Sequence, residues 1–227
     1  MRLLKILSAF ILMALLTVVT QVGGIVFLIS TLTFGIIDKK LSKRCTRVTA
    51  KILSFATLYL IFVFLVVPLT AKSFGRVPLP MFEDRNLKPG NIWTCLLNRH
   101  YVRSQLREIT FKVAAKLNEK YPGTTINYLD ANFPFLDNFP LLPHLSHNDG
   151  KKLDLSFQYK DGKTRQITNE IPSLIGYGIC EEPENGEVDM PKSCDKKVIG
   201  NTTCCATLSL KAIRTSSSST MNEQETL

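Results

Sequence analysis

Charged residues are missing from two long stretches of the 227-residue sequence: residues 6–37 contain none, and neither do residues 52–71. A helix that crosses a bilayer needs about 20 predominantly apolar residues, and a soluble domain of this size could hardly bury two such runs. The sequence therefore predicts two transmembrane helices, over about residues 6–32 and 52–71, and argues against an ordinary soluble protein.

The first apolar run lacks the small-residue cleavage site that would close a secretory signal peptide. Arg2 and Lys5 resemble the positive start of a signal peptide, but the run continues far beyond the usual apolar region. An uncleaved anchor is the better interpretation. Because the run exceeds one bilayer span, it must tilt, lie along the interface, or break near Gly23 and Gly24.

Cysteine is scarce, and none of the six cysteines forms a C-x-x-C motif. This gives no support for a zinc knuckle or a thioredoxin-like site. Cys45 lies between the two apolar runs, and we expect it to stay reduced. The others follow the second run, where disulfides are permitted: Cys95, Cys180, Cys194, Cys204 and Cys205. Five is an odd number, so their pairing is not deducible.

Basic residues are concentrated between the two predicted spans. Residues 36–51 carry six Lys or Arg against Asp38 alone, out of a net charge of +9 for the chain. By the positive-inside rule this loop is cytoplasmic, which places the N-terminus and the long C-terminal part outside. We therefore predict an integral protein of the inner or plasma membrane with an extracytoplasmic domain. Membrane lipid is its expected partner, and nucleic acid is not, because the basic stretch lies between two spans.

The predicted membrane region covers residues 1–72. The sequence after it predicts a small and incomplete α+β domain with an antiparallel sheet. Residues 73–101 contain three prolines and are interpreted as an extended linker, and residues 102–197 form the domain. A helix is predicted from Val102 to Lys120, where Pro122 and Gly123 end it. Its apolar positions recur at helical spacing: Leu106, Ile109, Val113 and Leu117.

Short strands follow the predicted helix. Thr124–Leu129 forms one, and Leu153–Tyr159 alternates apolar and polar residues and forms another. Lys160-Asp161-Gly162-Lys163 predicts a hairpin turn with residues 164–168 as the return strand. Residues 198–227 have no clear period and run into a Ser/Thr tract, so we predict a disordered tail.

Two of the three histidines lie close together in P-H-L-S-H-N-D-G-K-K-L-D, residues 143–154. Zinc sites use His nitrogen and carboxylate oxygen atoms, and a catalytic site leaves one position for water. Gly150 could let the chain turn so that His147 and Asp154 converge, with His144 near enough to be a further ligand. The alternative is a solvated polar loop that holds two histidines.

Within this stretch, S-H-N-D-G-K-K-L-D resembles the S-H-x-x-G-x-x-x-D signature of the zinc D-alanyl-D-alanine carboxypeptidases and penicillin-insensitive murein endopeptidases. The resemblance extends over about residues 102–178. It implies that His147 and Asp154 are zinc ligands, that His144 is accessory, and that Ser146 and Gly150 belong to the framework. It also implies a peptidoglycan peptide as substrate, with zinc polarising the scissile carbonyl and activating a bound water.

The sequence departs from that family in one respect: no histidine follows His147, whereas the family takes its third ligand and its base from a later histidine motif. Cys194, Cys204 or Cys205 could supply a thiolate, Glu170, Glu181 or Glu182 a base, and Arg165 an oxyanion contact, but none stands in a matching motif. We expect either a truncated or frameshifted peptidase, altered after Lys197 and inactive as given, or a non-catalytic relative. His100 is interpreted as a surface or interfacial residue.

A different class remains open, a non-enzymatic integral membrane protein whose outer domain binds envelope components or has a structural role. Zinc binding that disappears in His147→Ala and Asp154→Ala would separate the two classes. A transporter subunit is disfavoured, because two spans without an ionisable residue offer no path for a polar substrate.

Overall fold

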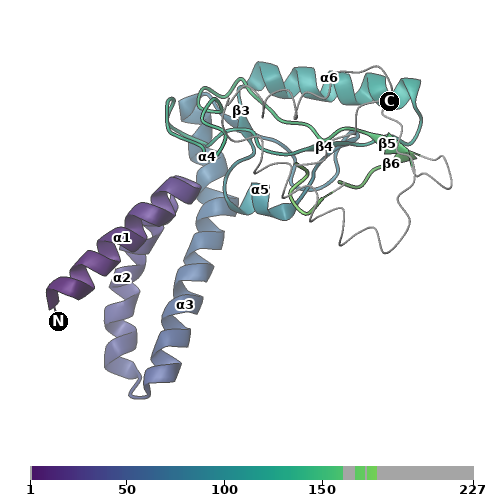
Figure 1. Cartoon of the computed structure of the whole chain (residues 1–227). Helices are drawn as coiled ribbons and strands as arrows, with labels where there is room; N and C mark the ends of the chain where they lie inside the picture. Colours follow the sequence, from purple (N-terminus) through teal and green to yellow (C-terminus); the bar gives the residue numbers. More distant parts are fainter. Residues whose placement is uncertain (1, 161–166, 172, 178–227) are drawn as a thin grey trace, which may run out of the picture.

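Three long helices precede a smaller mixed domain (Figure 1). The computed structural model describes residues 2–160, 167–171 and 173–177. The helices are α1 (Arg2–Thr20), α2 (Gly23–Lys40) and α3 (Arg44–Ile61). The last continues without interruption through the π-helical turn η1 (Phe62–Val66), α4 (Val67–Ala71) and the 3₁₀ turn η2 (Lys72–Phe74).

The first apolar run breaks into two helices, so the prediction of a single span over residues 6–32 is wrong. Gln21 has a φ of 64°, which a right-handed helix cannot continue, and α2 then folds back against α1. The close approach depends on glycine: a Cβ at Gly24 would lie 2.7 Å from the Met13 carbonyl oxygen. Small residues at such contacts are typical of helix pairs in membranes. The break near Gly23 and Gly24 is one of the three predicted solutions.

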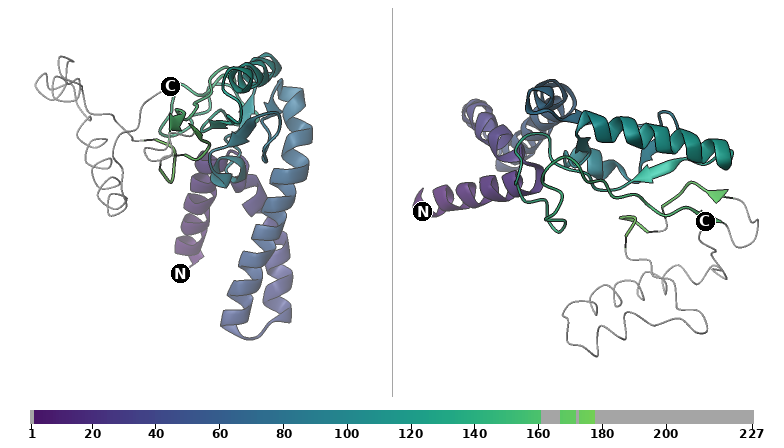
Figure 2. Two further views of the ribbon diagram at one scale, coloured as in Figure 1. Left: turned by 90° about the vertical axis from the view of Figure 1, so that its right-hand side faces the viewer. Right: turned by 90° about the horizontal axis from the view of Figure 1, so that it is seen from above.

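Because the first apolar run forms two antiparallel helices instead of one, the position of the N-terminus changes. The start of α1 and the turn between α2 and α3 lie at the same end of the helices, and the domain lies at the other end (Figures 1 and 2). The N-terminus was expected on the same side as the domain, whereas in the structure it lies at the opposite end of the helices from the domain. Arg2 and Lys5 therefore join the basic residues of the α2–α3 turn at one end.

Polar contacts and aromatic rings hold α2 and α3 together as an antiparallel hairpin. Lys51 Nζ lies 2.7 Å from Asp38 Oδ2, near the turn. Farther along, Thr33 and Ser54 share a hydrogen bond of 2.8 Å, and the ring of Phe27 contacts that of Phe55.

Two helices are long and apolar enough to cross a membrane, Leu3–Thr20 and the continuous helix Arg44–Phe74. Their apolar side chains are largely exposed rather than packed in a protein core. Helices that are apolar on most of their surface belong in a large core or in a membrane.

In the described part of residues 75–177, the α+β domain has two further helices and three short strand pairs. The helices are α5 (Ile92–Leu96) and α6 (Ser104–Lys120), the second agreeing with the predicted Val102–Lys120 helix. β1 (Val77–Pro78) pairs antiparallel with β3 (Tyr101–Val102), and β5 (Tyr159–Lys160) pairs antiparallel with β6 (Ile167–Thr168). β2 (Leu87–Pro89) pairs in parallel with β4 (Ile126–Tyr128), which the sequence did not predict.

The segment interpreted as a linker, residues 73–101, lies inside the domain. It forms β1, β2, α5 and the start of β3, and it places Leu79, Leu87 and Cys95 in the same buried cluster as Phe111 of α6. Its prolines keep each strand short but do not prevent this burial. The segment therefore builds the domain core instead of separating it from the membrane helices.

The predicted strand Leu153–Tyr159 is extended but scarcely paired. Leu155 forms an isolated bridge with Tyr128, and regular pairing begins only at Tyr159. β5 and β6 flank the predicted hairpin, whose turn residues 161–163 lie outside the described residues, as do Arg165, the cysteines after Cys95 and the tail 198–227.

Candidate metal centre

The site is built on the chain that leaves β4. The backbone N–H of Asp154 donates to the Asp130 carbonyl at 2.8 Å, and the Leu129 N–H donates to the Asp154 carbonyl at 2.8 Å. The carbonyl of Ala131, the residue after Asp130, lies 2.7 Å from Nδ1 of His147. Both candidate ligands are therefore positioned by consecutive residues of one buried segment.

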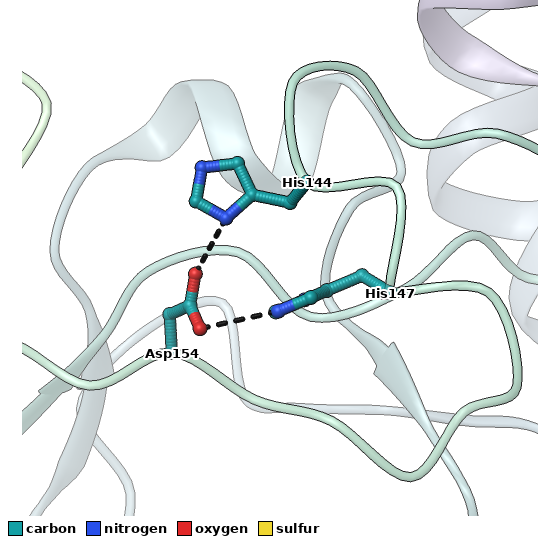
Figure 3. A group of neighbouring side chains, drawn as sticks. All are labelled: His144, His147 and Asp154. Atoms are coloured by element: carbon teal, nitrogen blue, oxygen red, sulfur yellow. Dashed lines mark ion pairs between the residues drawn. The ribbon is translucent and has the colours of Figure 1, made fainter. Parts of the chain in front are cut away.

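The structure brings His144, His147 and Asp154 together, as the sequence predicted (Figure 3). The Asp154 carboxylate lies between the two rings, with Oδ2 2.8 Å from His144 Nδ1 and Oδ1 3.1 Å from His147 Nε2. One ligand atom from each residue lies within 4.8 Å of those of the other two, so the group could hold a metal ion. His147 is buried, while His144 and Asp154 are partly exposed.

Hydrogen-bond chemistry makes a cation at this point favourable. A carbonyl oxygen can only accept, so His147 Nδ1 must carry the proton that it shares with Ala131. In the neutral ring, Nε2 then has a lone pair, and it faces a carboxylate that also only accepts. Either a proton, carried by the ring or by the carboxyl group, or a metal ion must lie between them.

The spacing of the two atoms suits a metal ion. Two ligand atoms at about 2.1 Å from a tetrahedral zinc ion lie roughly 3.4 Å apart, close to the observed 3.1 Å between His147 Nε2 and Asp154 Oδ1. The Ala131 carbonyl would fix the ring orientation and tautomer, as backbone acceptors do for zinc-bound histidines. The spacing of this pair is therefore compatible with a shared metal ion as well as with a hydrogen bond.

Gly150 sets the geometry of the loop between the ligands. Its φ is 78°, and a Cβ there would lie 2.6 Å from Nη1 of the buried Arg76. Asn132 holds the same turn, because its side chain accepts from the Gly150 N–H and donates to the Lys152 carbonyl. The glycine of the motif is therefore explained by a left-handed turn against a buried guanidinium group, while Ser146 is exposed.

Two residues next to the site, Tyr177 and Asp130, were not predicted from the sequence. The Tyr177 hydroxyl donates to Asp154 Oδ2 at 2.7 Å, accepts from the Asp130 N–H at 3.2 Å, and its ring contacts His144. Burial raises the pKa of Tyr177, which keeps the hydroxyl protonated as a donor. Asp130 is 8% exposed and pairs with Arg99 at 2.9 Å. Burial raises the Asp130 pKa, and Arg99 opposes that shift.

A cavity of about 450 Å³ opens beside His147 and Asp154. Its other walls come from α6, through Leu106, Ile109 and Val113, and from Leu153 and Leu155. Ile109 and Val113 belong to the apolar positions that recur at helical spacing, but they are exposed, and α6 buries Phe111 and Ala114 instead. Apolar side chains on α6 therefore line the approach to the candidate ligands.

Of the remaining candidates, only Glu170 lies among the described residues, and it is not part of this group. Glu170 is exposed, on the chain after β6, and Arg165, Glu181, Glu182, Cys194, Cys204 and Cys205 lie outside the described residues. His100 was expected at a surface or interface, and the structure buries it completely. Burial lowers the His100 pKa to about 4, so the ring is neutral at pH 7.

Comparisons of the chain with protein-family models, with curated proteins and with solved structures gave no match. The peptidase resemblance therefore rests on the motif, and the chemistry of the site rests on the geometry of its residues.

Proposed function

We propose that this protein is a membrane-anchored, zinc-dependent hydrolase of peptide bonds. His147 and Asp154 are the zinc ligands, and His144 takes the place of the third ligand that the sequence lacks after His147. On this arrangement we propose an active site, although the sequence alone led us to expect an inactive peptidase or a non-catalytic relative. The observation that carries the proposal is the pair formed by His147 Nε2 and Asp154 Oδ1, two acceptor atoms 3.1 Å apart with the ring already donating to Ala131. Zinc bound there would polarise a carbonyl and lower the pKa of a bound water.

The chain's own residues supply orientation and access. The Ala131 carbonyl and the Tyr177 hydroxyl hold the His147 ring and the Asp154 carboxylate in place. The partial exposure of His144 and Asp154 leaves one side of the group open to water. The cavity lined by α6 offers an apolar surface beside the reacting bond. We propose peptides of the cell wall as the substrate class.

The membrane placement that we propose has three helices in the bilayer. α1 and the helix Arg44–Phe74 are long and apolar enough to cross it, and α2 runs between them. Arg2, Lys5 and the basic residues of the α2–α3 turn share one end, which the positive-inside rule assigns to the cytoplasm. The α+β domain then lies on the extracytoplasmic side, where cell-wall peptides are found.

Hydrolysis by the full-length protein tests the proposal. Reconstituted protein loaded with zinc is incubated with a peptide ending in D-alanyl-D-alanine and with cross-linked muropeptides, and products are read by mass spectrometry. We expect cleavage that is lost on chelation and in His147→Ala and Asp154→Ala. A folded, zinc-loaded protein that cleaves neither substrate would leave a metal-binding domain without this hydrolase function.

A further inference from the structure

The helix α5 lies on the side of the domain from which the long helices project (Figure 1), and exposed apolar side chains occur on it and on the segment that follows β6. We define the α5 patch by four of these side chains: Ile92 (45% exposed), Trp93 (61%), Leu174 (84%) and Ile175 (60%). The two segments meet just before α5, where a Cβ on Gly90 would lie 2.9 Å from the Ile171 side chain. Seen from above, the domain extends to one side of the helices (Figure 2).

The apolar parts of the helices below the domain are short for a bilayer. Between Lys5 and the break at Gln21, α1 offers 15 uncharged residues, and α2 offers 15 between that break and Asp38. At 1.5 Å per residue each stretch spans about 22 Å. The hydrocarbon core is about 30 Å thick. A hydrocarbon layer of that thickness reaches past the break, to the level at which the domain begins.

A hydrogen bond fixes α5 at that level. The Tyr59 hydroxyl, near the end of α3, donates to the Leu96 carbonyl of α5 at 2.6 Å. Exposed apolar side chains continue along the long helix beyond this point, through Ile61, Phe64 and Leu65. α5 itself, Ile92–Leu96, contains no charged residue. The lipid-facing surface of the long helix is thus continuous with the underside of the domain.

We propose that the α5 patch enters the headgroup and acyl boundary of the adjacent bilayer leaflet, with Trp93 as its anchor. Tryptophan is enriched at this depth because its ring is apolar and its indole N–H can meet the polar layer. The proposal rests on the membrane placement given under the proposed function. It gives the domain a second attachment besides the long helix, and it holds the candidate metal centre at a fixed height above the bilayer.

Trp93 is the single tryptophan of the chain, so the fluorescence of the full-length protein reports on this position alone. The protein is reconstituted into phosphatidylcholine vesicles, flotation confirms insertion, and zinc content is measured on the same sample. Lipids brominated near the headgroup end of the acyl chain are compared with lipids brominated near the chain end. We expect roughly half of the emission to be lost with the shallow bromines, and much less with the deep ones. Aqueous iodide should quench weakly.

Ala115 provides the matched control, because it is exposed on α6, on the far side of the domain from α5. Trp93→Phe combined with Ala115→Trp moves the reporter there, where iodide should quench strongly and bromolipids should not. If Trp93 in floating vesicles behaves like this control, the patch does not enter the bilayer, although the membrane placement stands. If the protein does not float with vesicles, both the membrane placement and the insertion of the α5 patch are contradicted. The zinc content of the same sample then tests the metal centre separately.

Discussion

Gln21 Oε1 accepts a hydrogen bond from the backbone N–H of Phe135 at 2.9 Å, across 114 residues of sequence. Gln21 is the first residue after α1, and Phe135 lies in the loop that leads to His144. Nearby, the Asn98 amide donates to the Thr20 carbonyl at 3.2 Å. The break between α1 and α2 is therefore a docking point for the domain as well as a turn.

Gln21→Ala should loosen this docking point. The partly buried Phe135 N–H would lose its acceptor, which costs about 0.5–1.5 kcal/mol. Hydrogen exchange of full-length protein in nanodiscs should show faster exchange at the Phe135 amide. Thr31→Ala is the control, because Thr31 is exposed and bonds only within α2. Unchanged protection at Phe135 would show that Gln21 does not hold the loop.

Gly150→Ala should damage both stability and metal binding. The new Cβ would meet the Arg76 guanidinium at 2.6–2.8 Å, in addition to the strain of a φ of 78°. Backbone strain of this kind costs of order 1–3 kcal/mol. Gly123→Ala is a matched control, because Gly123 has a φ of 87° and no atom within 4 Å of the added Cβ. Equal losses of unfolding free energy in the two variants would contradict the role of the Arg76 contact.

Tyr177→Phe should weaken zinc binding without removing a ligand. The variant lacks the hydroxyl that donates to Asp154 at 2.7 Å. Loss of such an outer contact typically lowers metal affinity about 10–100-fold. Competition with a chromophoric chelator measures the change, and Tyr121→Phe, on a residue outside the site, is the control. An affinity equal to that of the wild type would remove Tyr177 from the site.

Acid should destabilise the domain through His100. Its folded-state pKa is lowered from 6.5 to about 4 by burial, so the unfolded chain binds the proton more tightly. Stability then falls as the pH drops from about 6.5 to 4, by roughly 3 kcal/mol in total. Urea unfolding at several pH values measures this slope. His100→Phe should flatten it, and a slope that is the same in both proteins would contradict the assignment.

Cys45 reports the topology. It is exposed in the first turn of α3, at the same end of the helices as Arg2 and Lys5. In intact cells, an impermeant maleimide should label Cys45 only after the membrane is permeabilised, as read by mass spectrometry of its peptide. Labelling in intact cells would place the α2–α3 turn outside and the domain in the cytoplasm.

The parts predictable from the sequence were those with a local signal. The uncharged runs predicted long apolar helices, and Gly150 between His147 and Asp154 predicted their convergence. Asp130 and Tyr177 were not predictable, because they reach the site from separate segments that only the fold brings together. The periodic stripe on α6 was misleading for a physical reason: Ile109 and Val113 line a cavity, and the apolar pattern is the same for a core and for a cavity wall.

Zinc content tests the central claim most directly. Full-length protein purified without chelator and supplied with zinc should hold one zinc ion per chain at neutral pH. His147→Gln and Asp154→Asn, checked for folding by circular dichroism, should each lose it. A folded wild-type protein that holds no zinc above the level of either variant would contradict the account. The 3.1 Å between His147 Nε2 and Asp154 Oδ1 would then be the distance of a hydrogen bond without a metal ion.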